Sequence, residues 1–360
     1  MTHPAPPVAV PNDLVSTSSS VRRLGLAATS GCDRARVLVR QGADLSKIAQ
    51  DFFGIDAHGI SAAALTTGNQ QEASLLRAGA APLIELLSAA GRLLPGEVGF
   101  LDIRSLPKAR QSKETLRLFG QRLLGGSPGV HLLAQPTFTV TIWGRRQTFR
   151  ADFAVMSTGS EPSLGEKKSF HDFNADTDQP AMRALLDQGG AYYALADVAL
   201  RQDGQAAAAD QLVPVLDAVL RGPRIYRLPV ADERDRTLRM LSSAYAADLD
   251  DVAADAARAA GATTLDAAFV EALGTNRGKH CASCPFRNKC RDDAYSTGDL
   301  SIVSTSTRPV ASVAGTARRA ASIVAGATPP ARHERDLALQ AAATRAELQG
   351  TGWTQRRFSA

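Results

Sequence analysis

The stretch FRADFAVMSTGSEPSLGEKKSF, residues 149–170, reads as two short strands joined by a turn. Residues 149–156 are rich in apolar and aromatic side chains, and residues 157–165 contain three Ser, two Gly and one Pro, a composition typical of turns. Successive side chains of a strand point to opposite faces, so Glu166 and Lys168 share one face. If the two strands pair, Asp152, Glu166 and Lys168 converge on one point.

Two carboxylates and a lysine at one point form a recognisable chemical set. The oxygens of Asp152 and Glu166 are suited to Mg²⁺ or Mn²⁺, ions that keep several waters and also coordinate substrate phosphate. Such an ion lowers the pKa of a bound water, and Lys168 would orient or deprotonate that water. The alternative is that these three residues are solvated charges on strands, because an Asp followed by Glu-x-Lys is common.

Composition favours a water-soluble globular protein, and its net positive charge is compatible with an anionic partner. The 360 residues are 44% hydrophobic, and the formal net charge is +5. No run approaches the roughly 18 apolar residues that a membrane-spanning helix needs. The two arginines near residue 22 precede an apolar core too short for an export signal, which needs about 7–15 residues. We therefore expect a cytoplasmic protein without membrane contact.

Patterns along the chain predict helices before and after a mainly antiparallel sheet, which is an α/β plan. The segment after Lys168 carries apolar residues at helical intervals, interrupted by Gly189 and Gly190. Gln188 and Tyr192 are four residues apart and so lie on one helix face. The expected elements are a disordered N-terminus at 1–20, helices at 61–87, 113–124 and 180–200, a strand at 98–103, a hairpin with strands at 131–141 and from 147 whose turn contains Gly144, and a mostly helical region at 205–275 with one short strand at 224–230.

Asp152, Glu166-x-Lys168 and Gln188-x-x-x-Tyr192, in this order, resemble the PD-(D/E)xK nucleases of the RecB type. The resemblance implies a restriction-endonuclease-like core, a central mixed sheet flanked by helices, in which Gln188 and Tyr192 help to position DNA near the metal. It also implies an N-terminal helical ligand to the metal. Glu72 occupies the matching place, where this chain has no histidine. Its alternative is a surface glutamate near a helix N-terminus.

The four cysteines form a second pattern. His280 precedes a Cys-x2-Cys-x5-Cys segment, and the fourth cysteine lies far upstream. A reducing cytoplasm argues against disulfides, and Cys-x2-Cys alone indicates a metal site, with zinc the default ion. A zinc site of the same ligands therefore stays open, and His280 could replace one cysteine. The cysteines are Cys32, Cys281, Cys284 and Cys290.

The chain has one cysteine before the expected nuclease core and three after it. This layout is similar to that of iron-sulfur nucleases of the AddB and CRISPR-associated RecB-like exonuclease families. The resemblance implies that all four cysteines bind a structural [4Fe-4S] cluster, which joins the N-terminal and C-terminal parts of the domain. The implied domains are an iron-sulfur nuclease domain at 21–300 with a helical insert at about 205–275, a flexible linker at 301–332, and a C-terminal helix and tail at 333–360.

The expected function is metal-dependent DNA hydrolysis on single strands or ends, with exonuclease activity favoured over endonuclease activity. The chain has no G-x-x-x-x-G-K-[ST] motif, so unwinding would come from a helicase partner. The resemblance suggests recombination, CRISPR adaptation or antiviral defence as the setting. Two alternatives stay open: a catalytically silent nucleic-acid-binding or scaffold subunit, and a zinc-stabilised regulator.

Overall fold

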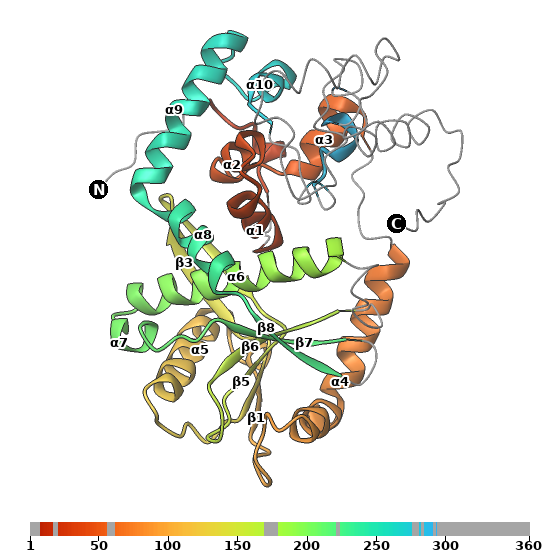
Figure 1. The fold of residues 1–360 in the computed structure, drawn as a ribbon, viewed down its shortest axis with the longest axis vertical. Coiled ribbons are helices and arrows are strands. Elements are labelled where there is room, and N and C mark those ends of the chain that lie inside the picture. Colours follow the sequence, from red (N-terminus) through yellow and green to blue (C-terminus); the bar gives the residue numbers. More distant parts are fainter. Residues whose placement is uncertain are drawn as a thin grey trace, which may run out of the picture. The chain divides into compact units, whose positions relative to one another are not determined.

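The computed structural model describes residues 8–16, 21–55, 62–168, 179–220, 224–275, 281, 284–290 and 293. The chain separates into two units, Met1–Gly274 and Thr275–Ala360. Both sheets and helices α1 to α10 belong to the first unit (Figure 1). The linker expected at 301–332 and the helix and tail expected at 333–360 lie outside the described residues.

The centre of the first unit is a six-stranded mixed sheet in the order β1-β2-β5-β6-β7-β8. The pairs β1–β2 and β6–β7 are parallel, and the other three pairs are antiparallel. Helices flank this sheet (Figure 1), so the expected mixed α/β class is confirmed. The strands are β1 Phe100–Asp102, β2 Leu132–Ala134, β5 Phe153–Val155, β6 Ser163–Lys167, β7 Val215–Val219 and β8 Ile225–Pro229.

Each face of the sheet packs against its own hydrophobic cluster. Ala154 and Leu164 belong to the cluster that includes the buried side chains of α6, whereas Phe153 and Val155 belong to the cluster that includes those of α4. Alternate residues of a strand point to opposite faces, which explains this division. Glu166 follows Leu164 by two residues and therefore faces α6.

Helices surround these strands. The region 205–275, which was expected to be mostly helical, contains two of the strands, β7 and β8. Strand β8 matches the predicted short strand, whereas β7 was not predicted from the sequence. Of the helices in the described ranges, none is long and apolar enough to cross a membrane. The helices are α1 Val21–Ser30, α2 Asp33–Arg40, α3 Leu45–Phe53, α4 Ala62–Ala89, α5 Lys108–Leu123, α6 Gln179–Gln202, α7 Ala206–Ala209, α8 Ala231–Leu241, α9 Ser243–Ala260 and α10 Ala267–Ala272, with 3₁₀ turns η1 Asn12–Leu14 and η2 Ile103–Ser105.

A separate two-stranded sheet is inserted between β2 and β5. It consists of β3 Thr137–Ile142 and β4 Arg145–Arg150, which pair antiparallel around a two-residue turn. Trp143 and Gly144 both have positive φ, 53° and 74°, as a tight hairpin turn of type I′ requires. The hairpin predicted around Gly144 is thus confirmed. The expected strand at 131–141 is instead two strands, because Gln135 adopts φ 55° and breaks it.

Residues 8–16 differ from the disordered N-terminus expected at 1–20. Val8 is fully buried, and Ala9 forms a β-bridge with Thr264. The backbone N–H of Asp44 donates to the carbonyl of Leu14 at 2.7 Å. This short segment therefore packs against distant parts of the first unit.

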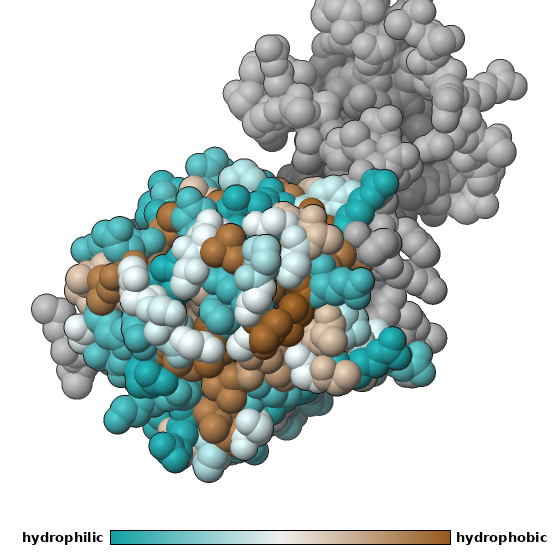
Figure 2. All heavy atoms as spheres, turned by 90° about the horizontal axis from the view of Figure 1, so that it is seen from below, coloured by the Kyte–Doolittle hydropathy of each residue, from teal (hydrophilic) through white to brown (hydrophobic). Residues whose placement is uncertain are grey.

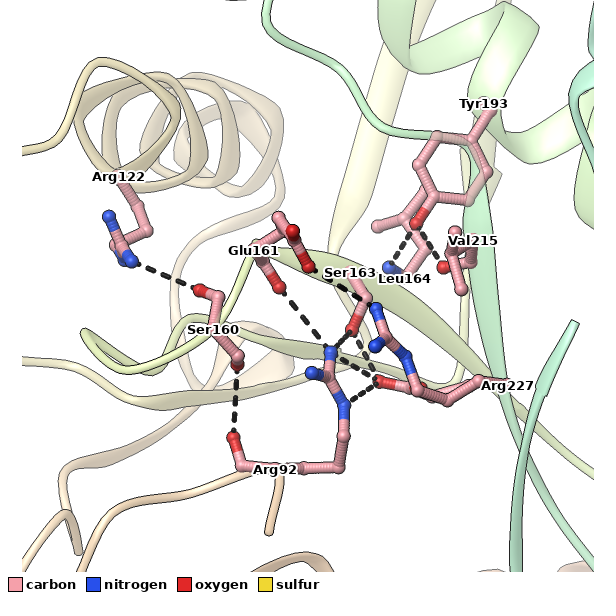
Figure 3. Close-up of polar contacts among 10 residues, drawn as sticks. Arg92, Arg122, Ser160, Glu161, Ser163, Leu164, Tyr193, Val215 and Arg227 are labelled. Atoms are coloured by element: carbon pink, nitrogen blue, oxygen red, sulfur yellow. Dashed lines mark hydrogen bonds and ion pairs between the residues drawn. The ribbon is translucent and has the colours of Figure 1, made fainter. Parts of the chain in front are cut away.

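Arg92, in the loop after α4, connects that loop to the sheet (Figure 3). Its guanidinium lies 3.0 Å from the fully buried carboxylate of Asp217 on β7 and donates to Ser163 Oγ on β6, also at 3.0 Å. It also donates to the carbonyl of Glu161 at 3.3 Å. A buried carboxylate is costly unless it is paired, so this ion pair holds the α4 side of the sheet together.

The surface of the first unit is mixed in polarity. Figure 2 shows one face, on which hydrophobic side chains gather between polar ones. The most exposed large apolar side chains of the described residues are Val98, Leu124 and Leu94. Scattered exposed apolar side chains of this kind are normal for a folded protein.

Helix α6 continues through the glycine pair at which the sequence suggested an interruption. The glycines instead allow neighbouring elements to approach closely. A Cβ atom at Gly190 would lie 2.3 Å from Cβ and 2.6 Å from the backbone carbon of Glu233 on α8. A Cβ atom at Gly25 on α1 would lie 2.2 Å from the carbonyl oxygen of Asp187 on α6. Both contacts are with backbone, which cannot move aside easily.

We predict that Gly190→Ala destabilises the protein by about 1–3 kcal/mol, because overpacking forces α8 away from α6. Gly120→Ala in α5 is the matched control. There the new methyl group would meet the flexible amide of Gln205, and helix propensity favours alanine by about 1 kcal/mol. Urea unfolding of both variants measures the difference. Equal stability of the two variants would contradict the close α6–α8 contact.

Candidate active site

Strands β5 and β6 pair antiparallel, so the pairing predicted from the sequence is confirmed. The first strand is shorter than the expected 149–156, because residues 149–150 belong to β4 and only Phe153–Val155 pair with β6. The register joins Phe153 to Gly165 and therefore places Asp152 opposite Glu166 at the end of the ladder. The backbone N–H of Asp152 donates to the carbonyl of Gly165 at 3.2 Å. The backbone N–H of Lys167 donates to Asp152 Oδ2 at 2.8 Å. These two bonds hold Asp152 at the edge of the β5–β6 pair.

The buried carboxylate of Glu166 is the centre of a closed hydrogen-bond network. Its Oε1 accepts from Lys168 Nζ at 2.7 Å and from Gln188 Nε2 at 2.9 Å, and its Oε2 accepts from the Tyr192 hydroxyl at 3.0 Å. Lys168 Nζ also donates to Gln188 Oε1 at 2.9 Å. Gln188 Nε2 lies 3.0 Å from the Tyr192 hydroxyl oxygen. The structure thus joins these four predicted site residues in one hydrogen-bond network.

Local geometry explains how these groups meet. Lys168 directly follows β6, and its backbone N–H donates to the carbonyl of Val219 on β7 at 2.9 Å. Gln188 and Tyr192 are one helical turn apart on α6, so both point at the same place on the sheet. The lysine side chain is 24% exposed and that of Glu166 is 7% exposed. Lys168 is therefore the member of the network that solvent reaches most readily.

Burial raises the pKa of Tyr192 well above its usual range, and the negative charges of Glu166 and then Asp152 raise it further. The hydroxyl therefore stays protonated and remains a hydrogen-bond donor at any physiological pH. Because the charge of Asp152 contributes to this shift, Asp152 and Glu166 act electrostatically on the same point of α6.

Asp187, next to Gln188 on α6, is a buried charged residue that sequence reasoning did not single out. Burial raises its pKa to about 6, although the charge of Arg183 opposes the shift. Arg183 lies 3.0 Å from Asp187 Oδ1 and 3.3 Å from Glu233 Oε1 on α8. The only signal in the sequence was the i,i+4 spacing of Arg183 and Asp187, which many surface ion pairs share.

The predicted metal ligands are only partly brought together. Asp152 and Glu166 face each other across the strand pair, whereas Glu72 lies on α4 and its side chain is outside the described residues. Among the described residues there is no group of three or more His, Cys, Asp or Glu side chains that could hold a metal ion. Mg²⁺ is often bound by one or two carboxylates, with waters and substrate phosphates completing its shell. Asp152 and Glu166 are two carboxylates in neighbouring positions of the strand pair, and both accept hydrogen bonds from protein groups.

The four cysteines are distributed between the two units, and none of them forms a disulfide. Cys32 precedes α2 in the first unit, where its thiol lies 3.9 Å from the carbonyl oxygen of Gly274. The other three belong to the second unit. There the backbone N–H of Cys284 donates to the carbonyl of Cys281 at 3.1 Å, so a turn closes the Cys-x2-Cys pair, and Cys290 is buried.

Comparison with known proteins assigns no family to this chain. No protein-family profile, curated protein or solved structure matches it.

We predict an energetic coupling between Gln188 and Tyr192 of about 0.5–3 kcal/mol, because the two side chains share one buried network. A double-mutant cycle of Gln188→Ala with Tyr192→Phe, followed by urea unfolding, measures it. The adjacent Tyr193 provides the control, since its hydroxyl instead bonds the backbone of Leu164 and Val215 (Figure 3). Tyr193→Phe should be additive with Gln188→Ala. Equal coupling in both cycles would contradict the network.

Proposed function

We propose that this chain is a metal-dependent deoxyribonuclease of the PD-(D/E)xK kind, with a restriction-endonuclease-like core and exonuclease activity on single strands or ends. The observation that carries the proposal is the network in which Lys168, Gln188 and Tyr192 all bond the carboxylate of Glu166. Asp152 stands opposite Glu166 in the strand register. Solvated strand charges, the alternative reading of these residues, do not explain a carboxylate that is buried and held by three donors.

The residues support distinct chemical roles. Asp152 and Glu166 would hold Mg²⁺ or Mn²⁺, which when bound activates water and neutralises charge that develops on phosphate. Glu72 is an additional candidate ligand on α4. Lys168, the more exposed member, is placed to orient the attacking water. As the water oxygen bonds to phosphorus, the phosphorus–oxygen bond to the leaving sugar breaks. The attacking water gives up a proton to solvent, and the leaving oxygen takes one from solvent.

Gln188 and Tyr192 position the other groups. Gln188 accepts a hydrogen bond from Lys168 and donates one to Glu166, so it fixes the distance between the ammonium and the carboxylate. The protonated Tyr192 hydroxyl holds the second oxygen of Glu166. Positioning of this kind is a large part of catalysis in phosphoryl transfer.

A structural [4Fe-4S] cluster bound by Cys32, Cys281, Cys284 and Cys290 completes the proposal. None of the four cysteines forms a disulfide, and four thiolates are the number that such a cluster uses. A link between residues 32 and 281 would close a loop of about 250 residues and would remove several kcal/mol of unfolded-state entropy in simple models. The proposed partners are DNA and a helicase or another protein of recombination or antiviral defence.

We expect Lys168→Ala to lower the cleavage of labelled single-stranded DNA with Mn²⁺ by roughly 10²- to 10³-fold, the usual range for loss of one positioned donor in an active site. Lys167→Ala is the matched control, because strand alternation directs Lys167 away from Glu166. It should retain activity within a few-fold. If wild type and Lys168→Ala cleave equally, or if neither cleaves, the catalytic assignment of Lys168 and its network is wrong.

We also expect protein purified without oxygen to be brown, to absorb broadly in the visible range, and to contain iron and sulfide. Removal of the iron by a chelator should lower the melting temperature, because the proposed cluster closes a long loop. Cys290→Ser should lose the absorption. A colourless protein that contains stoichiometric zinc would instead support the zinc-stabilised regulator.

A further inference from the structure

The two faces of the β3–β4 hairpin differ in character. One face buries Phe138, Val140 and Phe149 in the hydrophobic cluster that includes the side chains of α6. The opposite face consists only of threonine and arginine side chains, and neither strand contains Asp or Glu. The cross-strand pairs on this opposite face, which we call the Thr/Arg face, are Thr137 with Arg150, Thr139 with Thr148, and Thr141 with Arg146.

The positive charge of the Thr/Arg face is only partly offset. Burial raises the pKa of Asp102, but its hydrogen bonds with Arg104 and the charge of the nearby Arg150 lower it, so Arg150 has one carboxylate in its neighbourhood. Arg146 is exposed and has no carboxylate within ion-pair distance among the residues that the structure describes. The guanidinium of Arg150 bonds only neutral acceptors in the described contacts, Thr137 Oγ1 and Gln111 Oε1, both at 3.3 Å. A strand face that is merely solvated usually mixes charges of both signs. Arginine and hydroxyl donors without carboxylates are the groups that bind phosphate oxygens.

The hairpin is held rigidly, which reduces the entropy that binding would cost. Ser112 Oγ and Thr115 Oγ1 on α5 and Gln202 Oε1 on α6 accept outward N–H groups of β3 at 2.8, 3.0 and 2.9 Å. At the hairpin tip, Arg145 Nη2 donates to the carbonyl of Arg40, the last residue of α2, at 2.9 Å. Both the edge and the tip are thus fixed to helices of the first unit.

In the sequence, the Thr/Arg face ends directly before the candidate active site. Arg150, the last residue of β4, precedes Asp152 by two residues, so the two Cα atoms are at most about 7 Å apart. We propose that the Thr/Arg face binds the sugar–phosphate backbone of the single-stranded DNA that is to be cleaved. This inference rests on the proposed nuclease function and adds the surface along which the substrate lies.

Binding of a fluorescently labelled thymidine oligonucleotide at several salt concentrations tests the inference. All variants carry Lys168→Ala so that the DNA stays intact. Arg146→Ala should weaken binding and lower the slope of log affinity against log salt by about 0.7, the value for one single-strand phosphate contact. Arg146→Lys keeps the charge and should retain the slope. The matched control is Arg239→Ala on α8, an exposed arginine without a carboxylate partner in the described residues, which should leave the slope unchanged.

Two results would overturn the binding surface: equal slopes for Arg146→Ala and Arg239→Ala, or no binding of the oligonucleotide by the parent protein. Both arginines are exposed, so equal melting temperatures are expected and exclude misfolding as the cause. Failure of the nuclease proposal is distinguishable from failure of the binding surface. In that case Lys168→Ala would cleave DNA as well as wild type, whatever the salt slopes are. In protein that keeps Lys168, Arg146→Ala should raise KM for cleavage and leave kcat unchanged.

Discussion

The buried carboxylate of Glu166 is the constraint on which the candidate site depends. Removing a carboxylate from water is costly unless its oxygens accept hydrogen bonds from the protein. Here the donors come from the residue after β6 and from one face of α6. The helix therefore cannot rotate or slide along the sheet without leaving a buried charge unpaired. The same bonds that stabilise the site also fix the position of α6.

Close packing around α6 also fixes the position of this helix. Gly25 on α1 lies against the backbone of Asp187, and Gly190 lies against that of Glu233 on α8. Arg183 adds charge to this junction by pairing with both Asp187 and Glu233. Three helices are thus locked to one another on the side of the sheet that carries the proposed chemistry. Rigid support of this kind is what a preorganised site requires.

The β3–β4 hairpin leaves the central sheet after β2 and returns to it at β5. The departure is made by Gln135 with its left-handed backbone, and the return ends at Asp152. Asp152 is thus held from two directions, by its strand neighbour β6 and by the hairpin that precedes it. This arrangement places the Thr/Arg face of the hairpin, which is exposed at Thr141, Arg146, Thr148 and Arg150, directly before Asp152 in the chain. A nucleic-acid surface and a cleavage site on one segment would keep a fixed spacing.

The sequence by itself determined the local features of the site. Alternation in residues 149–170 predicted a strand pair with Glu166 and Lys168 on one face, and i,i+4 spacing put Gln188 and Tyr192 on one side of a helix. The turn at Gly144 was equally readable, because two residues of positive φ between strands need a glycine. These features depend only on backbone periodicity and turn chemistry, which act over a few residues.

Only the tertiary structure decided which of these local features meet. Periodicity could not reveal that α6 crosses the sheet so that its face reaches Glu166, nor that Gly189 and Gly190 serve close approach rather than a helix break. The pairing of β7 with β6 and the buried pair of Arg92 with Asp217 were equally hidden, since Gly165 pairs with Asp217 in the first and Arg92 is 125 residues from Asp217 in the second. Contacts over such separations are selected by the total burial of apolar surface and the satisfaction of buried charges. Those quantities belong to the whole fold and not to any local stretch of sequence.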